Sequence, residues 1–286
     1  MLSPQLAVKA SKLEEIIKDL QSVAVAFSGG VDSGLLAAVS HKILGNQAVA
    51  ITGRSHSFPT RELEAARELA GNLGLKHLEV DSEELDLPGF SDNPPNRCYL
   101  CKHELFSKIN ELARLQGLKA VVEASNIDDE GDFRPGMTAI KELGVVSPLR
   151  LAGLNKAEVR LLSKEMGLPT WDKPSFACLA SRFPYGEPIT PDRLDKVDQA
   201  ETFLLGLGLR QVRVRFHSQG DLARIETDED GLTILMTPAN RQAVRNYFRE
   251  LGFIYSTVDL GGYNSGSMNL TLPMAARQAA LKKTGA

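Results

Sequence analysis

Residues 23–33 read VAVAFSGGVDS, and residues 34–44 continue as a stretch rich in alanine and leucine. The first five residues are apolar and β-prone, two adjacent glycines follow, and the last stretch has the composition of a helix. This order places the backbone N–H groups of residues 29–33 at a helix N-terminus. Unpaired donors and the positive end of the helix dipole bind anions there. The sequence therefore predicts a phosphate-binding turn.

The residues of this turn suit a nucleotide. Gly29 and Gly30 allow positive φ and carry no Cβ that would keep a phosphate away. Ser28 and Ser33 add hydroxyl donors, and Asp32 can hold Mg²⁺ or its waters beside the phosphates. The chain has no GxxxxGK[ST] pattern, which excludes a Walker-type loop. We expect ATP with Mg²⁺ at this turn.

Composition bounds the class of protein. The chain has 286 residues, of which 43% are hydrophobic and 24% charged, as in ordinary globular proteins. Its net charge of −3 gives no general attraction to nucleic acid, and its three cysteines suit no disulfide framework. Charges interrupt residues 8–20, and no apolar run reaches 18 residues, so we expect no signal peptide and no membrane span. These features predict a cytoplasmic enzyme.

The order of predicted elements indicates an α/β fold. Strands and helices alternate in the first part, which predicts a parallel sheet with helices on both faces and ligands at the carboxyl ends of its strands. We expect a domain over residues 1–180 and a smaller α+β domain over residues 181–286. The predicted strands are 23–27, 48–52, 77–80, 120–124, 211–216, 222–226 and 254–260, and the predicted helices are 60–73 (with Thr60 as N-cap), 99–115, 156–166, 194–207 and 238–251.

A second polar loop follows the predicted strand 120–124. Residues 125–136 contain four acidic side chains and an arginine, and they share the predicted rim with the glycine turn. We expect Asn126 and Arg134 to contact ATP and Asp128 to assist in holding Mg²⁺. Arg54 and Ser55 end another strand and are expected to border the adenine or the ribose.

The cysteines form the second strong signal. Cys98 and Cys101 are three residues apart at the start of a predicted helix and so share one face. A CxxC pair serves as a redox pair, as half of a zinc site or as part of an iron–sulfur site, or it is structural. Cys178 lies in the segment that joins the two predicted domains. Three thiols and an ATP site in one chain favour sulfur chemistry.

Charged residues of the second predicted domain suit a phosphate ester. Arg213 and Arg215 are two apart on a strand and therefore share a face, where two guanidinium groups make a phosphate site. Arg182 is expected to join them. Glu201 and Glu226 are expected to accept hydrogen bonds from substrate hydroxyl or ammonium groups.

These motifs together resemble the PP-loop ATP pyrophosphatases, which split ATP between its α and β phosphates and activate a substrate by adenylation. More narrowly, the chain resembles the LarE family of ATP-dependent sulfur transferases, which mature the nickel-pincer nucleotide cofactor of lactate racemase. The resemblance covers about residues 20–270 and rests on SGGVDS, the loop 126–136, KAEVR at 156–160, CLASRFPYG at 178–186, VRVRF, ARIE and DLGG.

The resemblance implies a reaction. A carboxylate of pyridinium-3,5-dicarboxylate mononucleotide is adenylated, and sulfur then displaces AMP to leave a thiocarboxylate. Cys178 matches the sulfur-bearing cysteine of the family, and Arg213 and Arg215 match its phosphate-binding arginines. Family members associate as homo-hexamers.

The family has two branches that differ in the source of sulfur. In one, a lone cysteine surrenders its own sulfur and becomes dehydroalanine after one turnover. The present chain also has Cys98 and Cys101 and resembles the other branch, in which three cysteines hold a [4Fe-4S] cluster. Three thiolates leave one iron without a protein ligand, free to bind hydrosulfide and pass it on.

Three rival functions use the same glycine turn. A tRNA thiolase would show an aromatic-studded basic surface, which a charge of −3 with five Tyr and one Trp does not suggest. An amide-forming ligase of the NAD or GMP synthetase kind leaves the CxxC pair unexplained. A non-catalytic nucleotide sensor would bind ATP without releasing pyrophosphate.

Overall fold

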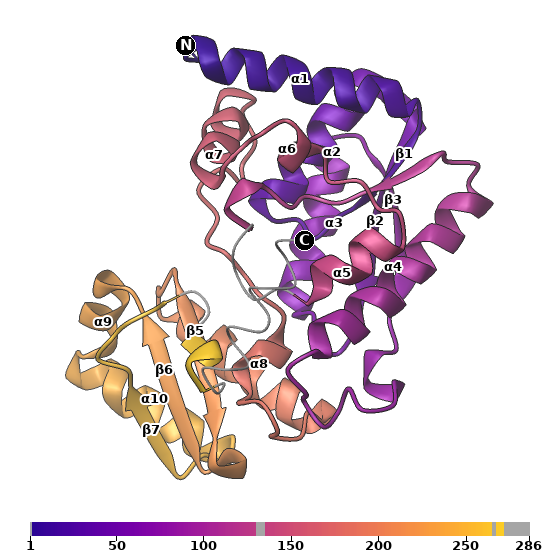
Figure 1. Cartoon of the computed structure of the whole chain (residues 1–286). Helices are drawn as coiled ribbons and strands as arrows, with labels where there is room; N and C mark the ends of the chain where they lie inside the picture. Colours follow the sequence, from indigo (N-terminus) through magenta and orange to yellow (C-terminus); the bar gives the residue numbers. More distant parts are fainter. Residues whose placement is uncertain (1, 130–134, 265–266, 272–286) are drawn as a thin grey trace. The chain divides into compact units, whose positions relative to one another are not determined.

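The computed structural model describes residues 2–129, 135–264 and 267–271 (Figure 1). The chain divides into two compact units. Within the described chain, the first contains residues 2–84 and 98–175, and the second contains residues 85–97 and 176–271. None of the described helices has the length and apolarity that crossing a lipid bilayer requires.

The first unit is built on a parallel sheet with strand order β3-β2-β1-β4. The strands are β1 (Val23–Ala26), β2 (Ala48–Arg54), β3 (Lys76–Asp81) and β4 (Ala120–Val122). The helices are α1 (Pro4–Leu20), α2 (Val31–Leu44), α3 (Thr60–Asn72), α4 (Arg97–Leu115), α5 (Gly136–Glu142), α6 (Pro148–Leu151) and α7 (Lys156–Glu165). The predicted α/β class and the parallel sheet are confirmed.

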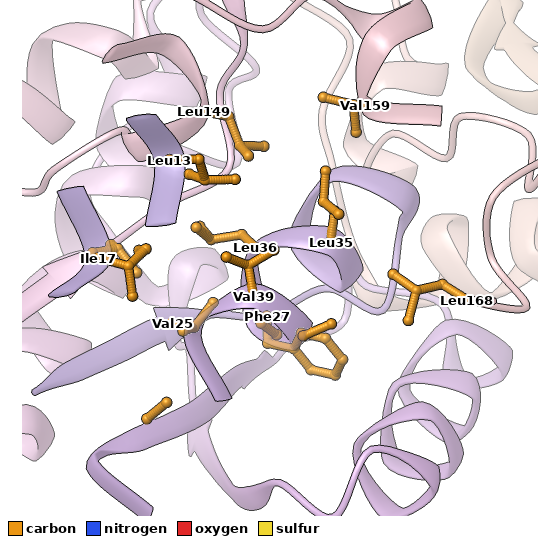
Figure 2. Packing of buried hydrophobic residues seen from close by; sticks show 14 of the residues in the cluster. Leu13, Ile17, Val25, Phe27, Leu35, Leu36, Val39, Leu149, Val159 and Leu168 are labelled. Carbon is orange, nitrogen blue, oxygen red and sulfur yellow. The ribbon is translucent and has the colours of Figure 1, made fainter. Parts of the chain in front are cut away.

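Alternation along the strands divides the core of this unit between the two faces of the sheet. Val23 and Val25 pack with α1, α2 and α7, whereas Ala24 packs with α4 and α5. Figure 2 shows the larger cluster, in which Leu35, Leu36 and Val39 of α2 lie over the sheet. Burial of α2 in this core fixes the glycine turn that precedes it.

The second unit contains a mixed sheet with strand order β5-β6-β7. Strands β5 (Val212–His217) and β6 (Leu222–Thr227) are antiparallel, and β7 (Tyr255–Val258) runs parallel to β6. Helices α8 (Pro191–Gly206), α9 (Glu229–Leu235) and α10 (Pro238–Glu250) complete the unit. A smaller α+β unit was expected here, and the structure contains one.

Several predicted boundaries are wrong by a few residues. Strand β1 ends at Ala26 and β4 at Val122, one and two residues earlier than predicted. Thr60 is the first residue of α3 and not its N-cap, a position that Pro59 takes without a side-chain hydrogen bond. Helices α5 and α9 were not predicted, because each is only seven residues long and too short to show helical periodicity.

Candidate functional site

The glycine turn lies between β1 and α2, as predicted. Gly29 has a φ of 67°, and Gly30 is the N-cap of α2 without a side chain that accepts a hydrogen bond. The Ser28 and Ser33 hydroxyls lie 3.0 Å apart and form a hydrogen bond across the turn. The first amides of α2 therefore form an anion-binding end backed by two hydroxyl groups.

Asp32 is held by two partners that come from distant parts of the chain. The Asn126 amide nitrogen donates to Asp32 Oδ1 at 3.2 Å, and Lys156 Nζ forms an ion pair with Asp32 Oδ2. The structure therefore brings together Asp32 and Asn126, which sequence reasoning placed on one rim. Lys156 was not among the predicted site residues, although it begins the KAEVR motif. It adds a positive charge beside the anion-binding end of α2.

A second lysine fixes the turn itself. Lys173 Nζ donates to the Gly29 carbonyl oxygen at 3.3 Å and pairs with Glu62 of α3 at 2.8 Å. Glu62 is buried, so this pair is shielded from water. Neither residue was predicted. Nothing in the sequence indicated that they contact the glycine turn, because Glu62 and Lys173 are far from it along the chain.

The loop after β4 is anchored by a buried carboxylate. Glu123 accepts hydrogen bonds from the backbone and hydroxyl of Ser125, at 3.0 and 2.7 Å, and from the Ser147 hydroxyl. Asp128 Oδ2 accepts from the Lys156 backbone N–H at 2.8 Å. Its observed role is to tie the loop to the start of α7. Arg134, predicted to contact ATP, lies outside the described residues.

Arg54 is the last residue of β2 and Ser55 follows it, as predicted. Their described contacts are with β3 and with the loop after β2. Arg54 pairs with Asp81 at 2.8 Å and with Glu79 at 3.5 Å, both on β3. The Ser55 hydroxyl lies 3.3 Å from that of Ser57. Their contact with a nucleotide stays a prediction.

The cysteines belong to different units. Cys98 and Cys101 lie in the first turns of α4, and Cys178 precedes a short 3₁₀ helix, Leu179–Arg182. All three are half-buried, and none forms a disulfide. Within the residues that the structure describes, no three His, Cys, Asp or Glu side chains gather as a metal-binding group.

Arg182 is fully buried and holds the Cys178 segment. Its Nε and Nη2 form a two-pronged ion pair with the Glu201 carboxylate at 2.8 and 2.9 Å. Its Nη1 donates to the carbonyl oxygens of Ala177 and Cys178, at 2.9 and 3.1 Å, and to the Ser181 hydroxyl at 2.8 Å. Burial alone would disfavour both charges, but their mutual attraction prevails: the pKa of Arg182 is raised and that of Glu201 is lowered.

Arg213 and Arg215 are buried on β5, with 2% and 4% of their surfaces exposed, so neither lies on a solvated face. Arg215 pairs with Glu226 at 2.6 Å, and its Nε is buried without a partner in the described chain. The Arg213 guanidinium lies 5.4 and 5.1 Å from the ring centres of Phe176 and Tyr263. Burial lowers the pKa of Arg213 to about 10, and the neighbouring charge of Arg182 adds to the decrease. An anion bound here would offset this crowding of positive charge.

Comparison with known proteins agrees with this geometry. The sequence profile of the asparagine synthase family matches residues 13–90, which include the glycine turn. One component of the glutamine-hydrolysing GMP synthase of Archaeoglobus fulgidus is 26% identical over 210 residues, covering 66% of this chain and 65% of that one. The fold and the SGGxDS turn define a PP-loop protein, and the chain is an ATP-dependent enzyme of this class.

Two relatives match nearly the whole chain. An uncharacterized protein of Synechocystis is 43% identical over 267 residues, covering 93% of this chain and 99% of that one. The pyridinium-3,5-bisthiocarboxylic acid mononucleotide synthase of Lactiplantibacillus plantarum is 39% identical over 271 residues, covering 94% of this chain and 97% of that one. The chain belongs to the LarE family, as its motifs predicted.

Proposed function

We propose that this chain is a cytoplasmic sulfur transferase that converts a carboxylate of pyridinium-3,5-dicarboxylate mononucleotide into a thiocarboxylate. The observation that carries the proposal is the Asp32 site: an anion-binding helix end, a carboxylate and a lysine meet at the turn of an ATP-using class. The 39% identity with a synthase of the bisthiocarboxylic acid mononucleotide supports the choice of substrate.

Two steps account for the chemistry. A substrate carboxylate oxygen attacks the α phosphorus of ATP, the bond to the β-phosphate bridging oxygen breaks, and pyrophosphate leaves. Hydrosulfide then attacks the acyl carbon, and AMP departs with the electron pair of the acyl C–O bond. The first amides of α2 and the hydroxyls of Ser28 and Ser33 would bind phosphate oxygens, and Lys156 would offset the charge that builds on pyrophosphate. Asp32 would hold Mg²⁺, which would offset negative charge on the phosphates of ATP.

The second unit would bind the mononucleotide. Arg213 and Arg215 would contact its phosphate, since both are buried cations and Arg215 has an unpartnered Nε. Glu226, which already pairs with Arg215, would orient that arginine, and it remains a candidate acceptor for a ribose hydroxyl. Arg182 and Glu201 form an ion pair with each other, so we propose that they hold the Cys178 segment in place.

We further propose that Cys98, Cys101 and Cys178 ligate a [4Fe-4S] cluster and that the protein forms homo-hexamers, as the resemblance implies. The donor set fits the cluster: three thiols outside disulfides, two of them three residues apart on one helix face. When bound, such a cluster supplies an iron site that accepts sulfide. Arg182 would fix the backbone of Cys178 through the hydrogen bond at 3.1 Å.

The Asp32→Ala variant tests the adenylation step. We expect pyrophosphate release that depends on pyridinium-3,5-dicarboxylate mononucleotide to fall at least about a hundredfold, because the variant loses the metal-holding carboxylate. Asp19→Ala removes an exposed carboxylate from α1 and should leave the rate unchanged. Melting curves would show that both variants fold. A wild-type rate from Asp32→Ala would overturn the assignment.

A further inference from the structure

A segment that follows β3 and ends at Arg97, the first residue of α4, belongs to the second unit. This segment, Leu85–Arg97, is hydrogen-bonded to residues that follow the Cys178 loop. The Gly186 N–H donates to the Asn93 carbonyl at 3.0 Å, and the Ile189 N–H donates to the Ser91 carbonyl at 2.8 Å. The Asn93 side-chain nitrogen donates to the carbonyls of Phe183 and Pro184, at 3.3 and 2.6 Å. The last residue of the segment, Arg97, is therefore held on a fixed backbone.

Arg97 carries a buried charge that the described chain does not neutralise. Only 4% of its surface is exposed. Its Nη1 donates to the Asn93 side-chain oxygen, and the guanidinium lies 5.0 Å from the centre of the Tyr185 ring. Its Nε is buried without a hydrogen-bond partner, and within residues 2–129, 135–264 and 267–271 no carboxylate pairs with Arg97.

This arrangement is unfavourable unless a ligand completes it. A buried cation needs a counter-charge, and neither an amide oxygen nor an aromatic ring supplies a full negative charge. The guanidinium has two edges that can bind an oxyanion through a pair of parallel hydrogen bonds. Asn93 occupies Nη1, whereas the edge formed by Nε and Nη2 has no described partner. That edge matches a carboxylate or a phosphate.

We propose that Arg97, positioned by Asn93 and Tyr185, is an oxyanion-binding residue that recognises a carboxylate of the substrate. This inference rests on the proposed function, in which the substrate carries two carboxylates and one phosphate. Arg213 and Arg215 account for the phosphate, and one carboxylate is adenylated, so the remaining carboxylate needs a counter-charge. Arg97 would thereby select dicarboxylates over monocarboxylates.

A cycle of variants and ligands tests the proposal. Binding would be measured by calorimetry without ATP, using pyridinium-3,5-dicarboxylate mononucleotide, its 3-monocarboxylate analogue and the dicarboxylate nucleoside that lacks the phosphate. In Arg97→Gln we expect about a ten- to hundredfold loss for both dicarboxylates and little change for the monocarboxylate. Arg97→Lys keeps the charge without the two-pronged edge and should lose less. Arg193→Gln is the control, because Arg193 also lies over an aromatic ring, that of Phe216.

The alternative outcomes lead to different conclusions about the role of Arg97. Equal losses for all three ligands would make Arg97 structural, and losses confined to the two phosphorylated ligands would make it a phosphate residue; both overturn the carboxylate assignment. A second measurement uses pyridine-3,5-dicarboxylate alone, which should raise the melting temperature of the wild type but not of Arg97→Gln. If the wild type binds no mononucleotide but shows this shift, the proposed function fails and the oxyanion site stands. If the shift is absent as well, both fail.

Discussion

At the scale of single residues, the Arg182–Glu201 pair should dominate the stability of the second unit. Both side chains are fully buried, and Arg182 also donates to the backbone of the Cys178 segment. Glu201→Gln leaves a buried arginine without its counter-charge, which typically costs about 3–5 kcal/mol. We expect this loss in the free energy of unfolding measured by urea denaturation.

The exposed pair of Lys42 and Glu14 is the matched control. Their side chains are 61% and 40% exposed, and Glu14→Gln should change the stability by less than about 1 kcal/mol. A similar small change from Glu201→Gln would show that the buried pair is not needed to hold the unit together.

These residues also show what a sequence can predict about a site. The two-residue spacing of Arg213 and Arg215 correctly placed both arginines on β5. It did not reveal that both are buried or that Arg182 forms an ion pair with Glu201. Burial and pairing depend on contacts between residues that are well separated along the chain. Asp32 and Asn126 were predictable since both follow strands of one sheet, whereas Lys156 and Lys173 reach the turn from other parts of the chain.

At the scale of elements, the two glycines of the turn should respond differently to alanine. Gly29 has positive φ, and a Cβ there would lie 2.8 Å from the Ala66 Cα of α3. Gly29→Ala should therefore lower the stability by about 2 kcal/mol or more. At Gly30 the nearest atom to a new Cβ is the Ser28 hydroxyl oxygen at 3.4 Å, so Gly30→Ala should fold normally. Thermal melting compares the two, and equal melting temperatures would contradict the prediction.

Elements were predicted best where apolar periodicity and glycine turns coincide. Strands β1, β2 and β3 and helix α4 lie where the sequence predicted them, with ends shifted by one or two residues. Strand ends are set by hydrogen bonds to neighbouring strands, which a single sequence does not contain. The segment Leu85–Arg97 lies between the predicted strand 77–80 and the predicted helix 99–115, where residues rich in proline, aspartate and asparagine gave no sign of a regular element. Its packing with the second unit depends on distant carbonyl groups.

At the scale of the whole molecule, the proposed cluster requires all three cysteines of the chain. Cys98 and Cys101 belong to the first unit and Cys178 to the second. If Cys178 alone donated its sulfur, the other two cysteines would be dispensable. The two schemes therefore predict different stoichiometries for one protein.

The decisive measurement counts product per chain. The protein would be reconstituted without oxygen and supplied with sulfide, ATP and pyridinium-3,5-dicarboxylate mononucleotide. The cluster scheme predicts many turnovers, an unchanged protein mass, and loss of the bound iron and of turnover in Cys98→Ala. The sacrificial scheme predicts at most one sulfur per chain, a mass loss of about 34 Da at Cys178, as expected when a cysteine gives up H₂S, and full activity in Cys98→Ala. Because the mass change is measured on the protein itself, it separates the schemes even when turnover is slow.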